Sequence, residues 1–478
     1  MGDFELRPIG PFVYEVARDR AAGMRVPARV FADETLLAQI RRDRSLQQLV
    51  NVATLPGIYG PALGMPDMHE GYGFPVGGVA ATRAPDGVIS PGGIGFDINC
   101  GVRLLASDLR HSELAPFLTA IVHDISRSIP TGFGRSGRLA LSPAQLDRVL
   151  AEGCGYVVGE LGLGVPEDLD FIESRGCLAS ADPAAVSERA KIRGHDQLGT
   201  LGGGNHFVEV QIVDTIFDDA AAAALGLFRD QITVLIHTGS RGLGHQVCSD
   251  YVAIMDQTMA LHGIAVPDRQ LACAPLSSTE GRRYFAAMCA AANFGWSNRQ
   301  VIAARVRQVF ARALAGRARH QLRLVYDVAH NTAKLERFGD VELCVHRKGA
   351  TRAFGPSSME LPRAYRGIGQ PVFIPGSMGT ASYVLVGTDA ARDLSLASAC
   401  HGAGRAMSRG AAKRQVHGNE LRRELEARGI VVRCPSSSEL AEEAPVAYKD
   451  VERVVDVVHG AGIARKVARL VPIGVVKG

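Results

Sequence analysis

The sequence predicts a mixed α/β (α+β) fold, and three observations support this prediction. Apolar runs rich in β-branched residues alternate along the chain with segments of helical pattern. Hydrophobic residues make up 46% of the 478 residues and charged residues only 21%, which is typical of a globular protein with a sizeable core. No internal repeat, low-complexity tract or long linker divides the chain. We therefore expect one large domain spanning residues 1–478.

The individual elements follow from local patterns. Ser142 is placed to cap a helix over 143–153, and Asp182 followed by Pro183 predicts a helix that starts at 183. An Ala- and Arg-rich stretch near 280–315 and the segments near 416–428 and 449–459 also have helical patterns. Six apolar runs have the length and composition of buried strands: 101–107, 206–213, 232–238, 322–330, 341–347 and 382–387.

Composition and charge exclude several classes of protein. The sequence has no secretory leader and no apolar run approaching the roughly 20 residues that cross a bilayer, so we expect neither export nor membrane insertion. Nine cysteines without a CxxC pair indicate reduced thiols in a cytoplasmic protein. A net charge of +4 is too small to identify a nucleic-acid partner. One helical stretch is rich in arginines, which could form a solvated helix face or contact nucleic acid: Arg299, Arg305, Arg307, Arg312, Arg317 and Arg319.

Five side chains with metal-binding chemistry lie at turns and at the ends of predicted strands. Asp97 and Cys100 are three residues apart before a strand, His206 follows a Gly-Gly-Gly-Asn run, and His237 and His330 end two apolar runs. Each histidine taken alone is more often a hydrogen-bonded structural residue than a metal ligand. Together the five are too few for two separate complete metal sites, but they suffice if the thiolate bridges two ions. Ligand softness alone favours zinc over manganese.

A second cluster has the chemistry of a nucleotide site. His401 lies among small residues with Arg405 and Arg409 close behind, so a phosphate could approach it and be held by guanidinium groups. A neutral imidazole can attack phosphorus, although a histidine at the start of a helix could also be a simple cap. The glycine-rich loop 375–382 offers backbone donors and hydroxyls to a phosphate or a base edge. Neither loop has a Walker or Rossmann pattern, which disfavours a P-loop kinase and a dinucleotide-dependent oxidoreductase.

As a set, the motifs of this chain resemble the RtcB family of GTP-dependent RNA ligases. The resemblance extends from about residue 60 to the last residue. It implies a single RtcB-like domain with mixed sheets flanked by helices around a deep metal and nucleotide cleft. The motifs that carry it are MPDMHEGYGFPVGG, GGIGFDINCGVRL, GTLGGGNHFVEV, HTGSRGLGH, DVAHNTAK, HRKGATRAF, PGSMGTASYVL, HGAGRAMSR, EEAPVAYKD and PIGVVKG.

The resemblance also implies roles for individual residues. Two Mn²⁺ ions, rather than zinc, are expected at Asp97, Cys100, His206, His237 and His330, with Cys100 shared between them. His401 is expected to become guanylylated. Arg241, Arg405 and Arg409 are expected to contact RNA phosphates. The residues expected around the guanine nucleotide are Asn205, His206, Phe207, Val208, Glu209, His330, Asn331, Pro375, Gly376, Ser377, Met378, Ser382, His401, Gly402, Ala403, Gly404, Tyr448 and Lys477.

The implied activity is the joining of RNA ends that carry a 3′-phosphate or a 2′,3′-cyclic phosphate to RNA ends that carry a 5′-hydroxyl. GTP and Mn²⁺ are the implied cofactors, tRNA splicing or RNA repair is the implied process, and an archease-like activating protein is a further candidate partner. Two other hypotheses use the same motifs. One is an end-capping enzyme that guanylylates 3′-phosphates but seals poorly, and the motifs do not exclude it. The other is a silent RNA-binding paralogue, which the retention of His401 and of every metal-type residue argues against.

Overall fold

Two large β-sheets carry the fold of this protein, which is described here from a computed structural model covering residues 4–132, 134, 136–316 and 321–478. Both sheets are mainly antiparallel, with parallel pairs at β3–β4 and β18–β19. The seven-stranded sheet has the order β1 (Arg7–Gly10), β2 (Val13–Val16), β3 (Ala28–Phe31), β4 (Ile58–His69), β5 (Val76–Arg83), β13 (Val341–Lys348), β12 (Asn331–Phe338). The eight-stranded sheet has the order β11 (Arg323–Ala329), β7 (Gly101–Arg110), β9 (Gln231–Thr238), β8 (Phe207–Ile216), β19 (Ala464–Lys477), β16 (Ser382–Gly387), β15 (Pro371–Ile374), and β18 (Val431–Arg433) pairs with β19.

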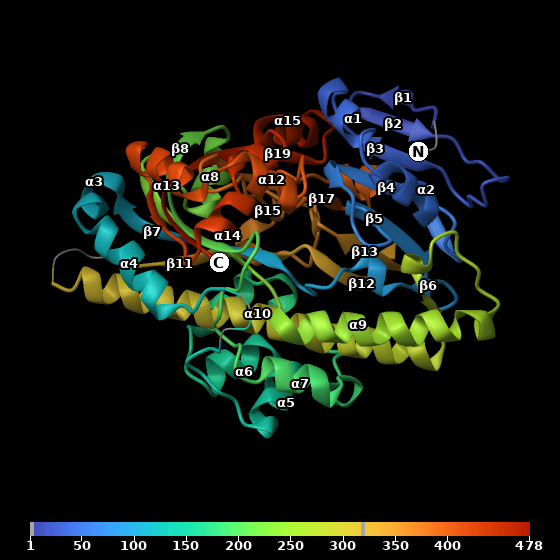
Figure 1. The fold of residues 1–478 in the computed structure, drawn as a ribbon, viewed down its shortest axis with the longest axis horizontal. Helices are drawn as coiled ribbons and strands as arrows, with labels where there is room; N and C mark the ends of the chain where they lie inside the picture. The colour runs from blue at the N-terminus through green and yellow to red at the C-terminus, as the bar shows by residue number, and fades with distance from the viewer. Residues whose placement is uncertain (1–3, 133, 135, 317–320) are drawn as a thin grey trace.

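Helices cover these sheets. The longest, α10 (Thr279–Ala313), runs beneath both sheets, with α9 (Arg241–Thr258) beside it (Figure 1). Most side chains in the middle of α10 are buried, because the helix contacts sheet strands and other helices around its circumference. The other helices are α1 (Glu34–Ile40), α2 (Ser45–Val52), α3 (His111–Leu114), α4 (Leu118–Ser128), α5 (Pro143–Glu152), α6 (Cys154–Gly159), α7 (Glu188–Gly194), α8 (Asp219–Leu225), α11 (Ala391–Ser395), α12 (Arg409–Gln415), α13 (Gly418–Ala427), α14 (Ser437–Glu442) and α15 (Val451–Gly460).

Two short two-stranded sheets accompany the large ones. In one, β6 (Val88–Ile89) pairs with β10 (Ala274–Pro275), and in the other, β14 (Ala350–Arg352) pairs with β17 (Ser398–Cys400). A single residue, His330, separates β11 of the eight-stranded sheet from β12 of the seven-stranded sheet. The chain therefore crosses from one sheet to the other at a candidate metal ligand.

The predicted mixed α/β class is confirmed, and each of the six predicted strands is present within a few residues of its expected bounds. Ser142 caps α5 as predicted, and the structure adds a capping box with Gln145. The predicted helix start at Asp182 is wrong. Asp182 caps only a 3₁₀ turn over Pro183–Ala185, and α7 begins after Ser187, whose hydroxyl accepts the N–H of Ala190. The chain is extended at Val186, between the two caps, and this separates the turn from the helix.

The hypothesis of a solvated arginine face on α10 is also wrong for its first members. Arg299 is fully buried and forms an ion pair with Asp327. Arg305 donates to the carbonyl of Gly199, and Arg307 pairs with Asp168. Of the remaining arginines, Arg312 is exposed, whereas Arg317 and Arg319 lie outside the described residues.

All nine cysteines are free. Within the ranges that the structure describes, no helix combines the length and the apolar character needed to cross a membrane.

Candidate metal and nucleotide site

Neighbouring strands of the eight-stranded sheet bring the predicted metal ligands to one edge. Cys100 directly precedes β7, His237 lies near the end of β9, His206 directly precedes β8, and His330 directly follows β11. Because β7 and β8 both run antiparallel to β9, and β11 runs antiparallel to β7, these four positions share the same end of the sheet. Asp97 reaches the cluster from the loop before β7.

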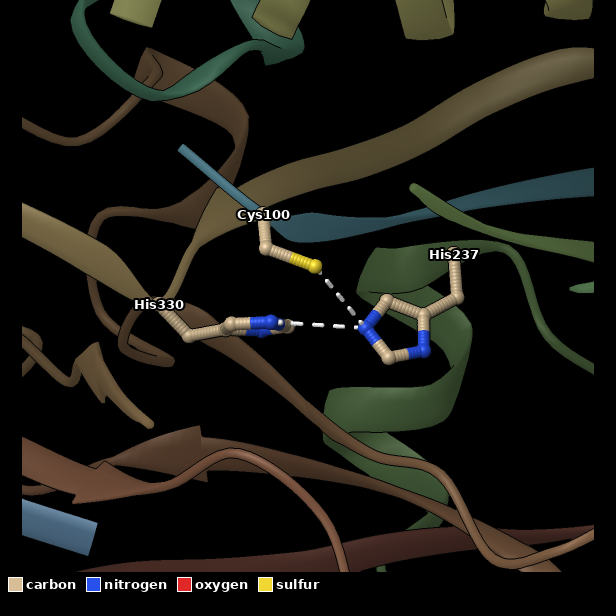
Figure 2. A group of neighbouring side chains, drawn as sticks. All are labelled: Cys100, His237 and His330. Atoms are coloured by element: carbon tan, nitrogen blue, oxygen red, sulfur yellow. Dashed lines mark hydrogen bonds between the residues drawn. The ribbon is translucent and has the colours of Figure 1, made fainter. Parts of the chain in front are cut away.

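The side chains of the cluster are in mutual contact. Cys100 Sγ lies 3.4 Å from Nε2 of His237, and His237 Nε2 lies 3.3 Å from His330 Nε2 (Figure 2). Cys100 Sγ also lies 3.4 Å from Nε2 of His206. His206 Nε2 is also 2.9 Å from Asp97 Oδ2. Two groups of three could each hold a cation, Cys100 with His237 and His330, and Cys100 with Asp97 and His206. Cys100 is common to both groups, which is the arrangement that a bridging thiolate needs.

The electrostatics of the cluster suit metal binding. Burial holds the pKa values of His237 and His330 well below the usual range, so both imidazoles are neutral and have a lone pair to donate. Burial, reinforced by the carboxylate of Asp97, raises the pKa of the Cys100 thiol well above its usual value. A cation on the sulfur would stabilise the thiolate and reverse that penalty. Asp97 Oδ1 is buried and has no hydrogen-bond partner among the described residues, so the cluster offers an unused acceptor.

His401 lies next to this cluster and is oriented by a carboxylate. It follows β17, and its ring lies 4.8 Å from the ring of His330. His401 Nδ1 is 2.7 Å from Oδ2 of Asp67, a fully buried residue of β4, and the backbone N–H of His401 donates to the same oxygen at 3.1 Å. A Cβ at Gly404, where φ is +75°, would lie 2.2 Å from the carbonyl oxygen of Asp67, so only glycine fits there. Because Nδ1 faces Asp67, Nε2 is the ring nitrogen available to other partners.

A cavity of about 390 Å³ lies between the two sheets, with Lys348 of β13 on one side and Phe207 of β8 on the other. Asp97, Cys100 and His237 contribute to its wall, and so do Arg405 and Arg409. The cavity therefore joins the metal-type cluster, the histidine and two arginines in one space. The residues expected at a nucleotide that line it are Asn205, Phe207, His330, Asn331, Pro375, Gly376, Ser377, Met378, His401, Gly402, Ala403, Gly404, Tyr448 and Lys477.

The other expected residues are not among those that line the cavity: His206, Val208, Glu209, Ser382 and Arg241. His206 belongs to the metal-type cluster, and Arg241 Nη1 lies 3.1 Å from its Nδ1. Gln211 Nε2 donates to Glu209 Oε2 at 2.8 Å and to Ser382 Oγ at 3.1 Å. Burial raises the pKa of Glu209 to about 8, and its Oε1 has no partner among the described residues.

Both arginines near His401 share one carboxylate. Arg405 Nη1 is 3.1 Å from Glu443 Oε2, and Arg409 Nε is 3.0 Å from Glu443 Oε1. The Tyr448 hydroxyl also donates to Glu443. Burial would raise the pKa of Glu443, but the charges of Lys477, Arg409 and Arg405 outweigh it and lower the pKa. The ionised carboxylate holds the two guanidinium groups in place at the cavity wall.

Three residues at the site have no role predicted from the sequence: Asp67, Glu443 and Lys348. Lys348 Nζ donates to the carbonyls of Tyr72 at 2.7 Å and Phe74 at 2.9 Å, and burial lowers its pKa to about 7. Each of the three lies inside one of the family motifs, and membership of that motif is the only sequence feature that points to the residue. Which member of a motif faces the cavity depends on how the two sheets meet.

The fold and the site define a class of protein: a mixed α/β protein with two groups of candidate metal ligands that share one cysteine, beside an arginine-lined cavity. Comparison with known proteins identifies the family. The family model described as "tRNA-splicing ligase RtcB" matches residues 48–478. The chain belongs to the RtcB family, as its motifs indicated.

Relatives named as RtcB ligases match this chain over nearly its whole length. A "tRNA-splicing ligase RtcB" of Archaeoglobus fulgidus is 51% identical over 99% of both chains. A protein of the same name from Thermococcus kodakarensis is 53% identical over 95% of both chains. The "RNA-splicing ligase RtcB" of Mycobacterium tuberculosis is 52% identical over 90% of this chain and 100% of its own.

Proposed function

We propose that this protein is an RNA ligase that joins a 3′-phosphate or 2′,3′-cyclic phosphate end to a 5′-hydroxyl end, using GTP and two Mn²⁺ ions, in tRNA splicing or RNA repair. An archease-like activating protein is part of the proposal as a partner. The observation that carries it is the position of His401: Asp67 holds its Nδ1, its ring lies against His330, and it faces a cavity that also contains Arg405. Together with membership of the RtcB family, this favours a nucleotidyl-transferring histidine.

The donor set fits two divalent cations. Asp97, Cys100 and His206 would hold one cation, and Cys100, His237 and His330 would hold the other. When bound, the ions would neutralise charge on phosphate oxygens at the reacting centre. Thiolate and imidazole alone would suit zinc, but phosphate oxygens of the substrates would add the hard donors that Mn²⁺ prefers.

The proposed reaction has three phosphorus-transfer steps. First, His401 Nε2 attacks the α-phosphorus of GTP, a P–N bond forms, and the bond to the β-phosphate breaks to release pyrophosphate. Asp67 stabilises the ring as it gains positive character. Next, an oxygen of the RNA 3′-phosphate attacks the same phosphorus, the P–N bond breaks, and a phosphoanhydride joins GMP to the RNA. Finally, the 5′-hydroxyl oxygen attacks the RNA phosphorus, GMP leaves, and the hydroxyl proton passes to solvent. A 2′,3′-cyclic end must first be hydrolysed to the 3′-phosphate.

Recognition of guanine is assigned to Glu209. Guanine presents N1–H and N2–H donors along one edge, and a carboxylate can accept both. Glu209 Oε1 is a buried acceptor without a partner in the described part of the chain, and Lys477, which lines the cavity, acts on it electrostatically. The loop that contains Ser377 also lines the cavity and can supply backbone donors to the nucleotide.

The deciding experiment is incubation of the purified protein with α-labelled GTP and Mn²⁺, followed by denaturing electrophoresis. We expect label on the wild-type protein only when divalent metal is present, and none on His401→Ala. Labelling of His401→Ala at the wild-type level would show that another residue is the nucleophile.

A further inference from the structure

Arg299, in the middle of α10, lies directly behind the candidate metal cluster and is not part of the proposed chemistry. Its side chain has no exposed surface. We infer that Arg299 is a positioning residue that fixes the relative places of the metal ligands by bonding the backbone beside them. This inference rests on the metal site in the proposed function, and it assigns to α10 a role that neither the motifs nor the family name provides.

The guanidinium group joins three segments that each carry a ligand. Nη1 donates to the carbonyl of Asn99 at 2.8 Å and to the carbonyl of Thr238 at 2.8 Å. These residues are the chain neighbours of Cys100 and His237. Nη2 donates to Asn99 Oδ1 at 3.0 Å and to Asp327 Oδ1 at 2.8 Å. Asp327 lies in β11, which ends just before His330.

These bonds are made where the local backbone most needs support. Asn99 has φ of +52°, a left-handed conformation that costs free energy for a residue other than glycine. Its side chain and its carbonyl both accept from Arg299, which stabilises that conformation. The turn therefore presents the Cys100 thiol toward His206 and His237 rather than away from them.

The ion pair itself is a poor explanation for the presence of Arg299. Asp327 is fully buried and also accepts from Arg103 Nε at 2.7 Å, so the carboxylate would keep one guanidinium partner without Arg299. Buried ion pairs contribute little net stability compared with apolar packing, because the desolvation cost offsets the attraction. What Arg299 adds beyond Arg103 is its set of bonds to Asn99 and Thr238, which are contacts to ligand-bearing backbone.

The test measures metal binding without RNA or GTP. Metal-free protein is titrated with Co²⁺ alone, and the near-ultraviolet thiolate-to-metal band and the visible bands are recorded. Arg299→Lys retains the charge but loses the planar fork, so it separates geometry from electrostatics. We expect it to weaken Co²⁺ binding roughly 10- to 100-fold, the range typical of residues that orient metal ligands, and to change the visible spectrum.

The matched control is Arg347→Lys. Arg347 is equally buried and pairs with Glu336, but its other acceptors, Ser398 Oγ and the Leu396 carbonyl, are not neighbours of a metal-type ligand. We expect it to lower the thermal stability and leave the Co²⁺ affinity and spectrum unchanged.

A second variant covers the case in which Arg299→Lys does not fold. Asn99→Gly keeps the left-handed turn but removes both the Oδ1 acceptor of Arg299 and the Nδ2 donor to the Ala292 carbonyl, and we expect at least about tenfold weaker Co²⁺ binding. Wild-type affinity and spectrum in a folded Arg299→Lys variant, or in Asn99→Gly, would overturn the inference. Failure of the wild-type protein itself to bind Co²⁺ would instead overturn the proposed metal site on which the inference depends.

Discussion

Asp67 Oδ2 lies 2.7 Å from His401 Nδ1, and this contact joins the seven-stranded sheet to the residue that we propose as the nucleophile. Asp67 is fully buried in β4, so its position is fixed by the sheet rather than by the loop that carries His401. The same oxygen accepts the backbone N–H of His401. One carboxylate thus sets both the position of the residue and the orientation of its ring.

Replacement of this carboxylate should slow guanylylation much more than it changes metal binding. We expect Asp67→Asn to lower the single-turnover rate of His401 labelling by roughly 10²- to 10⁴-fold, because the amide neither stabilises a positive imidazole nor fixes the reactive tautomer. The measurement is the time course of label from α-labelled GTP at saturating nucleotide. Asp168→Asn is the control, since Asp168 is also buried but pairs with Arg307 outside the cavity wall. An unchanged rate in Asp67→Asn would remove Asp67 from the mechanism.

The two groups of candidate ligands make different predictions for their members. Cys100→Ala should lower the content of both metal ions, because Cys100 is common to both groups. His237→Ala should mainly affect one ion, since it belongs to one group only. Metal content per chain, measured on dialysed variants by elemental analysis, distinguishes these outcomes. Near-complete retention of metal by Cys100→Ala would rule out a bridging thiolate.

Glu209 provides a prediction about pH. Its pKa is raised to about 8 by burial, so at neutral pH the carboxyl is mostly protonated in the nucleotide-free protein. Guanine needs the ionised form, so binding of GTP must release this proton. The apparent affinity should therefore fall as the pH drops below 8, by about tenfold for each pH unit. Binding is measured by calorimetry between pH 6 and pH 8.5 in buffers of differing ionisation enthalpy.

Glu209→Gln is the matched variant for that measurement, because it keeps the size of the side chain and cannot ionise. We expect it to bind GTP more weakly at pH 8, to lose the pH dependence that the wild type shows, and to discriminate less between GTP and ATP. If the wild type and Glu209→Gln had the same pH profile, Glu209 would not be the guanine acceptor.

The six strands predicted from the sequence are present because each is a continuous apolar run, whereas others such as β4 and β19, which are interrupted by glycine, proline or charged residues, were not predicted. It did less well where two local signals compete. Asp182 and Ser187 are both good caps a few residues apart, and only packing decides that the α-helix follows the second. Arg299 is a similar case, since its spacing on α10 suits a solvated face, whereas the surrounding strands bury it.

The candidate site was predictable in residue type but not in spatial relationship. Cys100, His237 and His330 were predicted as metal ligands because each has a metal-binding side chain at the end of a predicted strand. The acidic partners were different, because Asp67 and Glu443 come from segments far away in the sequence and meet the site only after the sheets pack together. No local sequence pattern predicts the contact of Asp67 with His401 or of Glu443 with Arg405.

The order of chemistry provides the test that separates a ligase from an end-capping enzyme. An RNA that ends in a 3′-phosphate should give a transient species extended by GMP, because a phosphate monoester is a poor electrophile until it carries a leaving group. Addition of an RNA with a 5′-hydroxyl should convert that species to a joined strand, whereas an RNA with a 5′-phosphate should not, since it lacks the free alcohol. Persistence of GMP-capped RNA in the presence of the 5′-hydroxyl strand would favour the capping enzyme.

Arg409 should matter more for these RNA steps than for the guanylylation of His401. Its side chain is 52% exposed, and its Nε contacts Glu443 at 3.0 Å, so part of the guanidinium faces solvent at the cavity wall and can meet an incoming phosphate. We expect Arg409→Ala to label with α-labelled GTP within about threefold of the wild type and to transfer GMP to the RNA 3′-phosphate at least about tenfold more slowly, as for the loss of one charge-assisted hydrogen bond. The two rates are measured separately, the first without RNA and the second by mixing pre-labelled protein with 3′-phosphate RNA.

Lys413→Ala is the control, because Lys413 also carries a positive charge on α12 but pairs with Glu442 and is not part of the cavity wall. Equal slowing of both steps in Arg409→Ala would mean that Arg409 supports the nucleotide site through Glu443 rather than contacting RNA.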